Sequence, residues 1–463
     1  MEKFCGEKVK NMSSTIKGID YEIKVVEGFK LPSFSNQNEI IVGRSILESD
    51  IKTGTLGDSI AGLLIPPIEY DNDLRELIEF YKVRVTIEQG FEIRQRFGKL
   101  TNEIDIPIEI IPISRMSLIK DLYPCIFNRA IEKVGLDGLR DEYKKYIENI
   151  GNIKENNSIN LSNKVLLMSA NKLLGTIGKN VILGFLAINS NKNINNEEKC
   201  VPNQLLMDPY TLLTIPEGNL ITNCSNVNNY LLKLLGSEYK CKRPSILSSS
   251  QLCYGNKTIV IKNYIYGLFK WFMAGAVSAS IYPFKQTPLD RLSNEYKALR
   301  DMRKIIITPK IIVICPDKYE SRMIREFIDG EVVLKSKDPY AWSILGESLA
   351  KIHNNNRVLG DPNPGNFVIT ENNEIALIDL EQVSNYSHKK AAWDIAVFFA
   401  YARTFQANSK LVKEALYAYA KSRSKEAWNS VLDYIKGPHL TALMTPLPNL
   451  LAELRLSLKD IDI

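Results

Sequence analysis

The hydrophobic pattern is easiest to interpret in the second half of the chain, where short apolar runs are interspersed with longer amphipathic stretches. Short runs rich in β-branched and aromatic residues predict strands, and apolar residues spaced three and four apart predict helices. We expect strands at Ile246–Leu247, Gln251–Tyr254, Thr258–Lys262, Ile311–Ile314 and Met323–Phe327, helices at Pro288–Met302, at Ala341–His353 and from Ala391 onward, and a hairpin of Asn366–Thr370 with Glu374–Leu380. This order predicts an α+β domain of two lobes, the first built on strands and the second on helices.

The first half predicts a separate α/β region followed by a connector. Strand-like runs occur at Ile40–Val42, Ala61–Ile65, Val83–Ile87 and Ile104–Ile113, and helical patterns at Asp73–Tyr81, Met116–Ile150, Val165–Leu174 and Asn229–Leu235. The Asn-rich stretch Gly151–Asn163 is typical of a surface linker. We therefore expect an α/β domain over 1–150, a helical and loop connector over 151–236, and the two-lobed domain over 237–463.

Composition and charge narrow the class of protein. With 463 residues, 45% of them hydrophobic and 24% charged, the chain is expected to fold, which excludes a wholly disordered chain, a collagen-like rod and a small disulfide scaffold. The net charge of +6 is too dilute over this length to indicate nucleic-acid binding.

The cysteines and histidines carry no metal motif. The seven cysteines are scattered and none forms a CxxC pair, so we expect reduced thiols and a cytoplasmic protein. Three histidines are too few for a histidine-rich metal centre.

The most apolar segment is Gly267–Phe284, which carries Lys270 near its start. Its uninterrupted apolar part is shorter than the roughly 20 residues of a membrane-spanning helix. We expect a buried or surface-lying helix, with membrane contact as the less favoured alternative. The N-terminal MEKFCGEKVKNMSS turns polar too early for a secretory signal.

The candidate chemistry lies in LGDPNPGNFVITENNEIALIDLEQ, residues 359–382. Asp361 and Asn366 lie in a Pro- and Gly-rich loop, and Asp379 ends the second strand of the expected hairpin. Phosphoryl transfer needs a carboxylate to orient or deprotonate the acceptor hydroxyl, and oxygen ligands for the metal ions on the phosphates. We expect Asp361 to act as the base and Asn366 and Asp379 to bind Mg²⁺ or Mn²⁺.

This segment resembles the catalytic and metal-binding loops of the protein-kinase-like superfamily. It is most similar to the atypical branch, which includes RIO-type kinases, KEOPS-complex kinases, aminoglycoside and choline phosphotransferases and UbiB-type proteins. In these families the loop has the sequence HGDxxxxN and is followed by a hairpin and an Ile-Asp pair. This chain has Leu359 at the position of the usual histidine. The resemblance covers about residues 240–440 and implies a kinase fold that uses ATP.

The resemblance also implies residues that bind the nucleotide. Lys262 matches the lysine that holds the ATP phosphates, and Glu295 matches its glutamate partner on the following helix. The segment IREFIDGE resembles the hinge, so backbone groups near Glu326, Phe327 and Ile328 are expected to bind adenine. The glycines of the phosphate loop are missing, and Ser248, Ser249 and Ser250 stand in that turn.

Asp394 resembles the aspartate that braces the catalytic loop, and it follows Asp379 by only 15 residues. The long activation segment of conventional protein kinases does not fit in this interval, which leaves the atypical and small-molecule branches. Within them we expect protein Ser/Thr hydroxyls as acceptors, with a small hydroxylated metabolite or a lipid-linked hydroxyl as alternatives. A pseudokinase that binds nucleotide or a partner and acts as a scaffold is the alternative outside enzymes.

The first 150 residues faintly resemble a nucleotidyltransferase core. That chemistry needs two carboxylates one residue apart to hold two metal ions. Asp58 stands alone because residue 60 is Ile, although Asp105 or Glu109 could supply a further carboxylate. We therefore favour an unrelated α/β domain over a degenerate or an active transferase.

Overall fold

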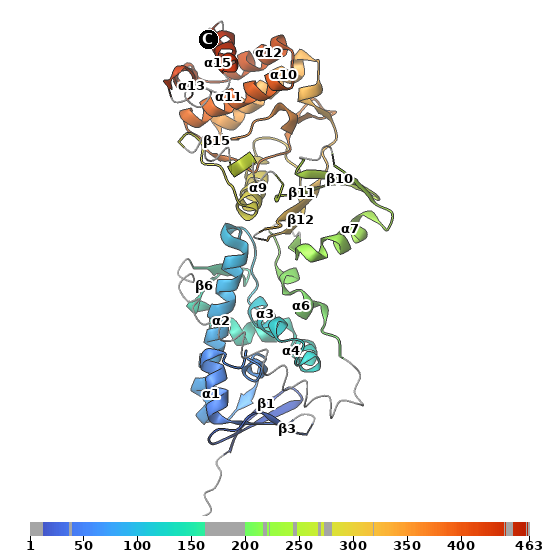
Figure 1. Ribbon diagram of the computed structural model, residues 1–463, viewed down its shortest axis with the longest axis vertical. Helices are drawn as coiled ribbons and strands as arrows, with labels where there is room; N and C mark the ends of the chain where they lie inside the picture. The colour runs from blue at the N-terminus through green and yellow to red at the C-terminus, as the bar shows by residue number, and fades with distance from the viewer. Residues whose placement is uncertain are drawn as a thin grey trace, which may run out of the picture. The chain divides into compact units, whose positions relative to one another are not determined.

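The computed structural model describes residues 13–36, 39–162, 200–215, 220–221, 223–243, 248–266, 270–272, 280–317, 319–438, 440, 448–459 and 461. Its contacts divide the chain into an N-terminal unit, Met1–Ile221, and a C-terminal unit, Thr222–Ile463 (Figure 1). The expected helix Val165–Leu174 and the expected strand Ile246–Leu247 lie outside the described residues.

The N-terminal unit contains a mixed sheet of order β3-β4-β2-β1-β5, in which β2 and β4 run parallel. Residues on one face of β2 are buried in alternation, as period-2 patterning requires. The strands of this sheet are β1 (Ser13–Gly18), β2 (Tyr21–Val26), β3 (Ser33–Asn36), β4 (Glu39–Gly43) and β5 (Glu69–Tyr70). The strands β6 (Gly151–Ile153) and β7 (Ile159–Leu161) form a two-stranded sheet, and β8 (Leu220–Ile221), at the end of the unit, belongs to neither of these sheets. The helices of the unit are α1 (Arg44–Thr53), α2 (Arg75–Phe97), α3 (Ile110–Leu118), α4 (Pro124–Lys144) and α6 (Gln204–Met207).

Three strands expected in this unit are wrong. Ala61–Ile65 begins with a 3-10 turn, because the Asp50 carboxylate accepts the Ile60 and Ala61 N–H groups (3.2 and 3.0 Å) that a sheet would use. Val83–Ile87 lies inside α2, whose buried positions recur every three or four residues. Ile104–Ile113 is irregular, with isolated bridges only, until α3 begins at Ile110.

The expectation of reduced thiols is also wrong for six cysteines. Disulfides join Cys125 to Cys200, Cys224 to Cys315 and Cys241 to Cys253. The cysteines of the first pair are 75 residues apart in sequence and those of the second pair are 91 apart, so no local motif predicts these bonds. The third pair lies directly across neighbouring strands.

The first lobe of the C-terminal unit is an antiparallel sheet with two helices. Its strands are β9 (Lys240–Lys242), β10 (Ser250–Tyr254), β11 (Thr258–Asn263), β12 (Ile311–Cys315) and β13 (Arg322–Glu326), and its helices are α7 (Val227–Leu235) and α9 (Pro288–Met302). The strands lie in the order β9-β10-β11-β13-β12. With α9 inserted between β11 and β12, this is the strand order of a protein-kinase small lobe.

The second lobe is mainly helical, and Figure 1 shows its helices gathered beyond β15. It contains α10 (Pro339–Asn354), α11 (His388–Thr404), α12 (Ser409–Lys421), α13 (Lys425–Lys436) and α15 (Pro448–Lys459), with short strands β14 (Glu331–Val332), β15 (Arg357–Val358), β16 (Phe367–Ile369), β17 (Ile375–Leu377) and β18 (Ser384–Asn385). The predicted hairpin is β16 with β17. The α+β fold of two lobes is therefore confirmed.

Helix α7 packs on the small-lobe sheet, although the sequence placed it in the connector. Val227, Leu231 and Leu235 share a buried cluster with Ile259 and Ile261 of β11. The C-terminal unit, which begins at Thr222, therefore includes α7.

Leu231→Ala is therefore expected to destabilise the C-terminal unit by about 2–5 kcal/mol, since it leaves a cavity under α7. Leu231 is 4% exposed, whereas the neighbouring Leu232 is 47% exposed, and Leu232→Ala should cost less than about 0.5 kcal/mol. All four tryptophans, at 271, 342, 393 and 428, belong to this unit, so tryptophan fluorescence during urea unfolding reports it alone. Equal losses in the two variants would contradict the packing of α7.

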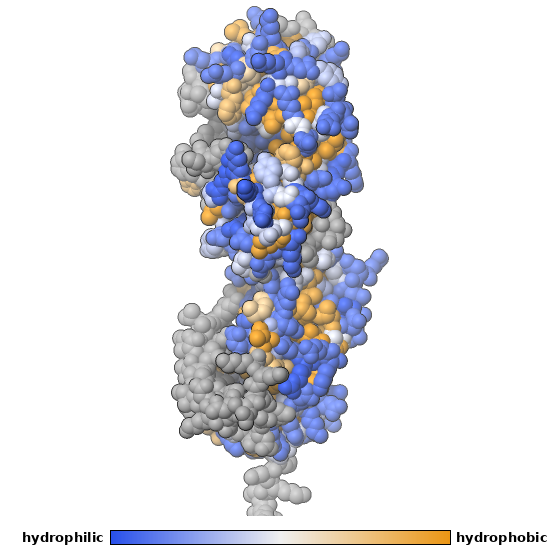
Figure 2. Space-filling model, turned by 90° about the vertical axis from the view of Figure 1, so that its right-hand side faces the viewer, coloured by the Kyte–Doolittle hydropathy of each residue, from blue (hydrophilic) through white to orange (hydrophobic). Residues whose placement is uncertain are grey.

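No helix among the described residues is long and apolar enough to cross a membrane. On the face drawn in Figure 2, the coloured residues are mainly polar, and hydrophobic residues lie between them in separate groups. The membrane contact considered for Gly267–Phe284 rests on residues of which only 270–272 and 280–284 are described.

Candidate active site

Lys262 lies at the centre of the candidate site. β11 carries it on the face of the sheet opposite to Ile261, and its side chain is fully buried. Its Nζ donates to Glu295 Oε2 of α9 (2.7 Å) and to Asp379 Oδ1 (2.7 Å), and Glu381 Oε2 lies 3.4 Å away. The structure therefore brings together three residues that the sequence placed in one site, and adds Glu381.

Glu295 is fixed from two further directions. Arg325 of β13 donates to its Oε1 (2.9 Å) and the Tyr264 hydroxyl donates to its Oε2 (2.7 Å). Both partners are buried, so the glutamate cannot swing away without leaving charges unpaired. The sequence carries no signal for Arg325, because β13 is RMIRE and carries charged residues at both ends as well.

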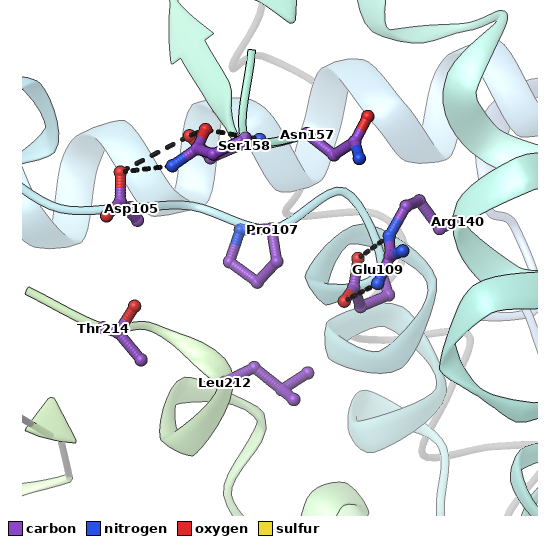
Figure 3. A pocket seen from close by; sticks show the side chains of 9 residues that line it. Asp105, Pro107, Glu109, Arg140, Asn157, Ser158, Leu212 and Thr214 are labelled. Atoms are coloured by element: carbon purple, nitrogen blue, oxygen red, sulfur yellow. Dashed lines mark hydrogen bonds and ion pairs between the residues drawn. The ribbon is translucent and has the colours of Figure 1, made fainter. Parts of the chain in front are cut away.

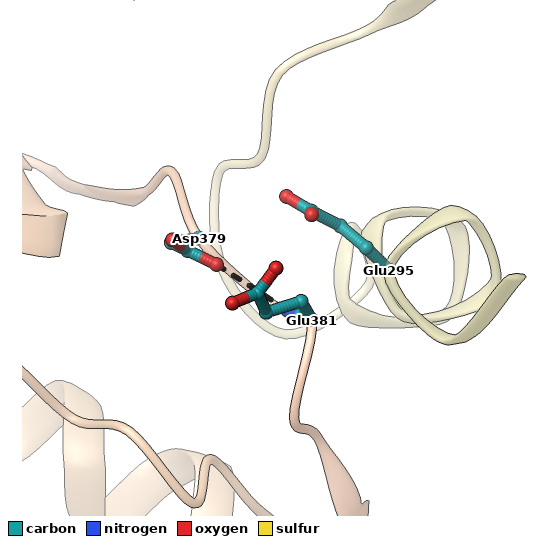
Figure 4. A group of neighbouring side chains, drawn as sticks. All are labelled: Glu295, Asp379 and Glu381. Carbon is teal, nitrogen blue, oxygen red and sulfur yellow. Dashed lines mark hydrogen bonds between the residues drawn. The ribbon is translucent and has the colours of Figure 1, made fainter. Parts of the chain in front are cut away.

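Glu381 connects the helix α9 to the segment after β17. Arg291 lies 3.4 Å from its carboxylate, and Asn294 donates to its carbonyl oxygen (3.0 Å). Figure 4 shows Glu295, Asp379 and Glu381 turned toward one another, with ligand atoms within 4.8 Å. Because Lys262 already bridges all three, a metal ion placed between them would compete with its ammonium group.

The charged groups in this cluster shift one another's pKa values. Burial would lower the pKa of Lys262, but Asp379, Glu295 and Glu381 raise it above its ordinary value. Burial would raise the pKa of Asp379, but Lys262 and Arg325 outweigh it and lower that pKa. Burial, with Asp379 and Glu295 adding repulsion, raises the pKa of Glu381 to about 7. At neutral pH the cluster thus holds an ionised Asp379 beside a cationic Lys262.

Asp379 and Asn366 fit the expected metal ligands by their chemistry. Asp379 uses Oδ1 for Lys262, and the side chain is 26% exposed, which leaves carboxylate oxygen for an incoming ligand. The carbonyl of Asn366 accepts the N–H of Ile378 (3.0 Å), and this bond ties the loop to the segment that carries Asp379. Carboxylate and amide oxygens are the ligands that Mg²⁺ prefers, so these two residues would hold it.

Asp361 lies in the loop between β15 and β16, and its Oδ2 accepts from Lys270 (2.8 Å). Lys270 also lies over the rings of Trp271 and Tyr401, 4.3 and 5.6 Å from their centroids. Burial would lower the pKa of Lys270, but Asp361 raises it above its ordinary value. Lys270, from the apolar segment 267–284, therefore places a positive charge beside the candidate base. The sequence did not predict this contact.

Asp394 of α11 braces this loop, in the position that the resemblance implied. Its carboxylate accepts the N–H groups of Leu359 (2.7 Å) and Gly360 (2.8 Å). Gly360 has φ of 76°, and a Cβ there would lie 2.6 Å from the Tyr282 ring, so only glycine fits. The backbone before Asp361 is thus held on both sides.

His353 supplies an imidazole from α10 where the loop itself has Leu359. Its Nε2 lies 3.1 Å from Asp394 Oδ2 and its Nδ1 lies 2.7 Å from the Tyr419 hydroxyl. A carboxylate can only accept, so Nε2 carries the proton and Nδ1 accepts from Tyr419. Its position at the end of the helix before the loop was the only signal in the sequence.

Stability of the C-terminal unit is expected to depend on His353 between pH 7 and pH 5. Burial lowers the pKa of His353 below its ordinary 6.5, so the folded protein keeps the ring neutral while the unfolded chain protonates it. The contribution of the neutral ring to the free energy of unfolding is complete above pH 6.5. It is lost as the pH falls, by up to about 1.4 kcal/mol per pH unit. His353→Gln should have lower stability at pH 7 but a flatter pH dependence, and urea unfolding at several pH values measures the difference. Parallel curves for the two proteins would contradict a buried neutral histidine.

The expected hinge follows β13 and leads through β14 into the second lobe. The N–H of Glu326 is bonded to the carbonyl of Lys310 (2.9 Å), so this group is already occupied. Within the described residues, the backbone of Phe327 and of Ile328 has no hydrogen bond outside regular structure. These two residues therefore remain the better candidates for adenine.

The expected phosphate loop lies between β9 and β10. Ser248 Oγ donates to the carbonyl of Ser250 (2.9 Å), and the carbonyl of Ser249 accepts the N–H of Asn263 (2.8 Å). Ser250 is the first residue of β10 and pairs directly with Lys262. The serines thus lie beside the lysine, as expected for a loop over the phosphates.

The carboxylates considered for a nucleotidyltransferase are committed to other partners. Asp58 is 2% exposed and is held by the guanidinium groups of Arg84 and Arg115. Asp105 and Glu109 line opposite sides of a pocket of about 230 Å³ (Figure 3). There Glu109 binds Arg140 through two bonds (2.9 and 3.1 Å), and Asp105 accepts from Asn156 (3.2 Å). Among the described residues, the candidate metal-binding group does not include any of these carboxylates.

Comparison with known proteins gives one family match. Residues 313–412, from β12 to the start of α12, match the model of the lipopolysaccharide core biosynthesis protein (WaaY) family. No curated protein matches the sequence. Similar solved structures include an aminoglycoside-3'-phosphotransferase of type VIII, at 11% identity over 45% of this chain and 98% of that one, with a TM-score of 0.31. They also include WbdD, at 14% identity over 43% of this chain and 50% of that one, with a TM-score of 0.26.

The order of the small-lobe strands, the Lys262–Glu295 pair and the braced loop carry the assignment of class. Together with the family match, they define the chain as a phosphotransferase of the protein-kinase-like superfamily, as the sequence predicted. The matched family is one of lipopolysaccharide core biosynthesis proteins, and the match begins in the small lobe and includes the hinge, Asp361 and Asp379.

Proposed function

We propose that this protein transfers the γ-phosphoryl group of ATP to a hydroxyl group of a carbohydrate, with Mg²⁺ or Mn²⁺. The observation that carries the proposal is the buried contact of Lys262 with Glu295 and Asp379, beside a loop that presents Asp361. A scaffold that only binds a partner has no need of all these groups in one place. The alternative of a pseudokinase therefore takes second place.

Each residue has a role in this proposal. Lys262, held by Glu295, binds the ATP phosphates, and the turn Ser248–Ser250 covers them. The backbone N–H groups of Ser248 and Ser249 serve this role, because the N–H of Ser250 donates to Ser248 Oγ (3.2 Å). Asn366 and Asp379 hold the metal ion, which neutralises charge on the phosphates. Adenine binds to backbone groups of Phe327 and Ile328.

Asp361 then accepts the proton of the acceptor hydroxyl while the oxygen of that hydroxyl attacks the γ-phosphorus. The bond between the γ-phosphorus and the oxygen that bridges it to the β-phosphate breaks in the same step. The products are ADP and a phosphomonoester. Lys270, 2.8 Å from the Asp361 carboxylate, places a positive charge where negative charge gathers on the transferred group.

Two structural features and the family match favour a carbohydrate over the protein Ser/Thr acceptor that the sequence favoured. The interval from Asp379 to Asp394 holds only a turn, β18 and the first residues of α11, so there is no platform for a peptide there. Trp393 donates to the carbonyl of Gly360 (3.0 Å) beside the candidate base, and Phe284 packs against Trp393 (5.9 Å). Half-buried aromatic rings offer flat surfaces for the C–H faces of a sugar. The matched family is also named for a carbohydrate-containing product.

The acceptor is tested with γ-labelled ATP and Mg²⁺, by offering monosaccharides, a lipopolysaccharide core oligosaccharide and a Ser/Thr peptide library in parallel. We expect label on a carbohydrate and none on the peptides. Label on the peptides alone would replace this proposal with the protein-kinase alternative.

Asp379→Asn is expected to weaken binding of Mg-nucleotide roughly tenfold or more, whereas Asp361→Asn leaves it nearly unchanged. A metal ligand contributes to the ground-state complex, while a base acts mainly as bonds change. Calorimetry with Mg²⁺ and a non-hydrolysable ATP analogue measures both variants. Repeating the titration with EDTA is the control, because the difference between the variants should then shrink. Equal affinities with Mg²⁺ would contradict the assignment of roles.

We also propose a cytoplasmic location, since the reaction consumes ATP. The three disulfides are unusual in a reducing compartment, although intracellular proteins of hyperthermophiles do contain them. Fractionation of the source cells tests the location, and recovery of the protein outside the cytoplasm would refute it.

A further inference from the structure

A cleft of about 340 Å³ lies between α7 and the small-lobe sheet. Ile261 and Asn263 of β11 line it, and side chains alternate along a strand, so the cleft lies on the face opposite to Lys262. It is therefore separate from Lys262 and the carboxylates around that residue, and of the residues given roles above only Ser249 belongs to its lining. Its size is that of a pocket for a small molecule.

The cleft carries positive charge without a matching carboxylate. Its lining includes Arg243 and Arg322, and among the lining residues that the structure describes none is acidic. Glu320 reaches Arg322 from outside the lining (3.4 Å), but its side chain is 58% exposed, so the pair is weak. The cleft thus has a formal charge of +2.

The surroundings of both arginines favour binding of an anion. Arg243 stacks on the ring of Tyr266, 4.3 Å from its centroid, and donates to the Tyr266 hydroxyl (2.6 Å), which fixes its guanidinium plane. The Nε of Arg322 is buried and has no hydrogen-bond partner in the described part of the chain. Asn263 accepts the N–H of Ile265 through Oδ1 (3.1 Å), so its amide N–H₂ group is left as a donor. A buried guanidinium N–H without a partner indicates a missing acceptor.

We propose that this cleft binds a small phosphomonoester. Such a group carries a charge of about −1.5 to −2 at neutral pH, which matches two arginines, and guanidinium forks bind its oxygens in pairs. Leu231 and Ile261 form an apolar wall beside the arginines, which suits a ligand with an apolar body. The proposal does not depend on the proposed kinase activity.

The probe is phenyl phosphate, titrated into the full-length protein by calorimetry with excess Mg²⁺ and a non-hydrolysable ATP analogue, which keep the nucleotide site from contributing. We expect saturable binding of one molecule per chain, and roughly tenfold or greater weakening in Arg243→Gln and in Arg322→Gln. Lys436→Gln removes a positive charge from the exposed end of α13 and should bind as wild type. Inorganic phosphate should bind more weakly than phenyl phosphate, and phenol should not bind.

A second variant keeps the test valid if an arginine variant does not fold. Gln251→Glu is nearly isosteric and puts a carboxylate into the lining of the cleft, so it should fold and lose binding at least roughly tenfold. Absence of saturable binding in wild type, equal binding by phenol, or wild-type affinity in Gln251→Glu would overturn the proposal.

Discussion

Lys262→Met is expected to abolish turnover and also to destabilise the C-terminal unit by about 3–5 kcal/mol. The side chain is fully buried and is the cation that contacts Glu295, Asp379 and Glu381 together. Its loss leaves Glu295 with Arg325 and Glu381 with Arg291, and takes the ion-pair partner from Asp379. Tryptophan fluorescence in urea measures the loss of stability, and initial rates with γ-labelled ATP measure turnover.

Glu381→Gln provides the control for this variant. The pKa of Glu381 is raised to about 7, so this carboxylate is partly protonated at neutral pH and its neutralisation should cost little. In the double variant Lys262→Met with Glu381→Gln, part of the lost stability should return while turnover stays absent. A single Lys262→Met variant as stable as wild type would show that Lys262 does not offset the repulsion among the three carboxylates.

Asp361→Asn is expected to lower turnover about 10²- to 10⁴-fold, since the reaction loses its base. The fold should persist, because the Asp361 side chain is bonded to Lys270 and Asp394 braces the loop through backbone groups. Asp433→Asn, an exposed carboxylate of α13, removes the same charge and should leave turnover unchanged. Rates at saturating ATP check the prediction, and similar rates for both variants would remove Asp361 from the chemistry.

The architecture of the C-terminal unit was predictable because its signals are local. The limits of α9 and the turn between β10 and β11 follow from periodicity and from turn residues. The spacing of Asp361, Asn366 and Asp379 identified the loop, and the short interval to Asp394 identified the branch. The sequence also placed Lys262 and Glu295 in one site, 33 residues apart, through their order along the chain.

The remaining features depend on contacts that no local pattern reveals. Lys262 ends a predicted strand, and nothing in the strand pattern indicates that its side chain is fully buried. Arg325 and Glu381 join the site only because the sheet and α9 bring them there. The disulfides join cysteines as far as 91 residues apart in sequence. In the first half of the chain, an apolar run that predicted a strand forms part of the helix α2, because the same residues fit the buried face of a helix.

The most direct test of the account is a single-turnover experiment with γ-labelled ATP, Mg²⁺ and an excess of the full-length protein, quenched at successive times in the presence of a carbohydrate acceptor. We expect label to leave ATP and to appear in a phosphomonoester at the rate at which ADP forms, and we expect Asp361→Asn to bind ATP but to release no label. Tight binding of Mg-ATP by the wild type without formation of ADP or phosphomonoester would contradict it and would identify the protein as a nucleotide-binding scaffold.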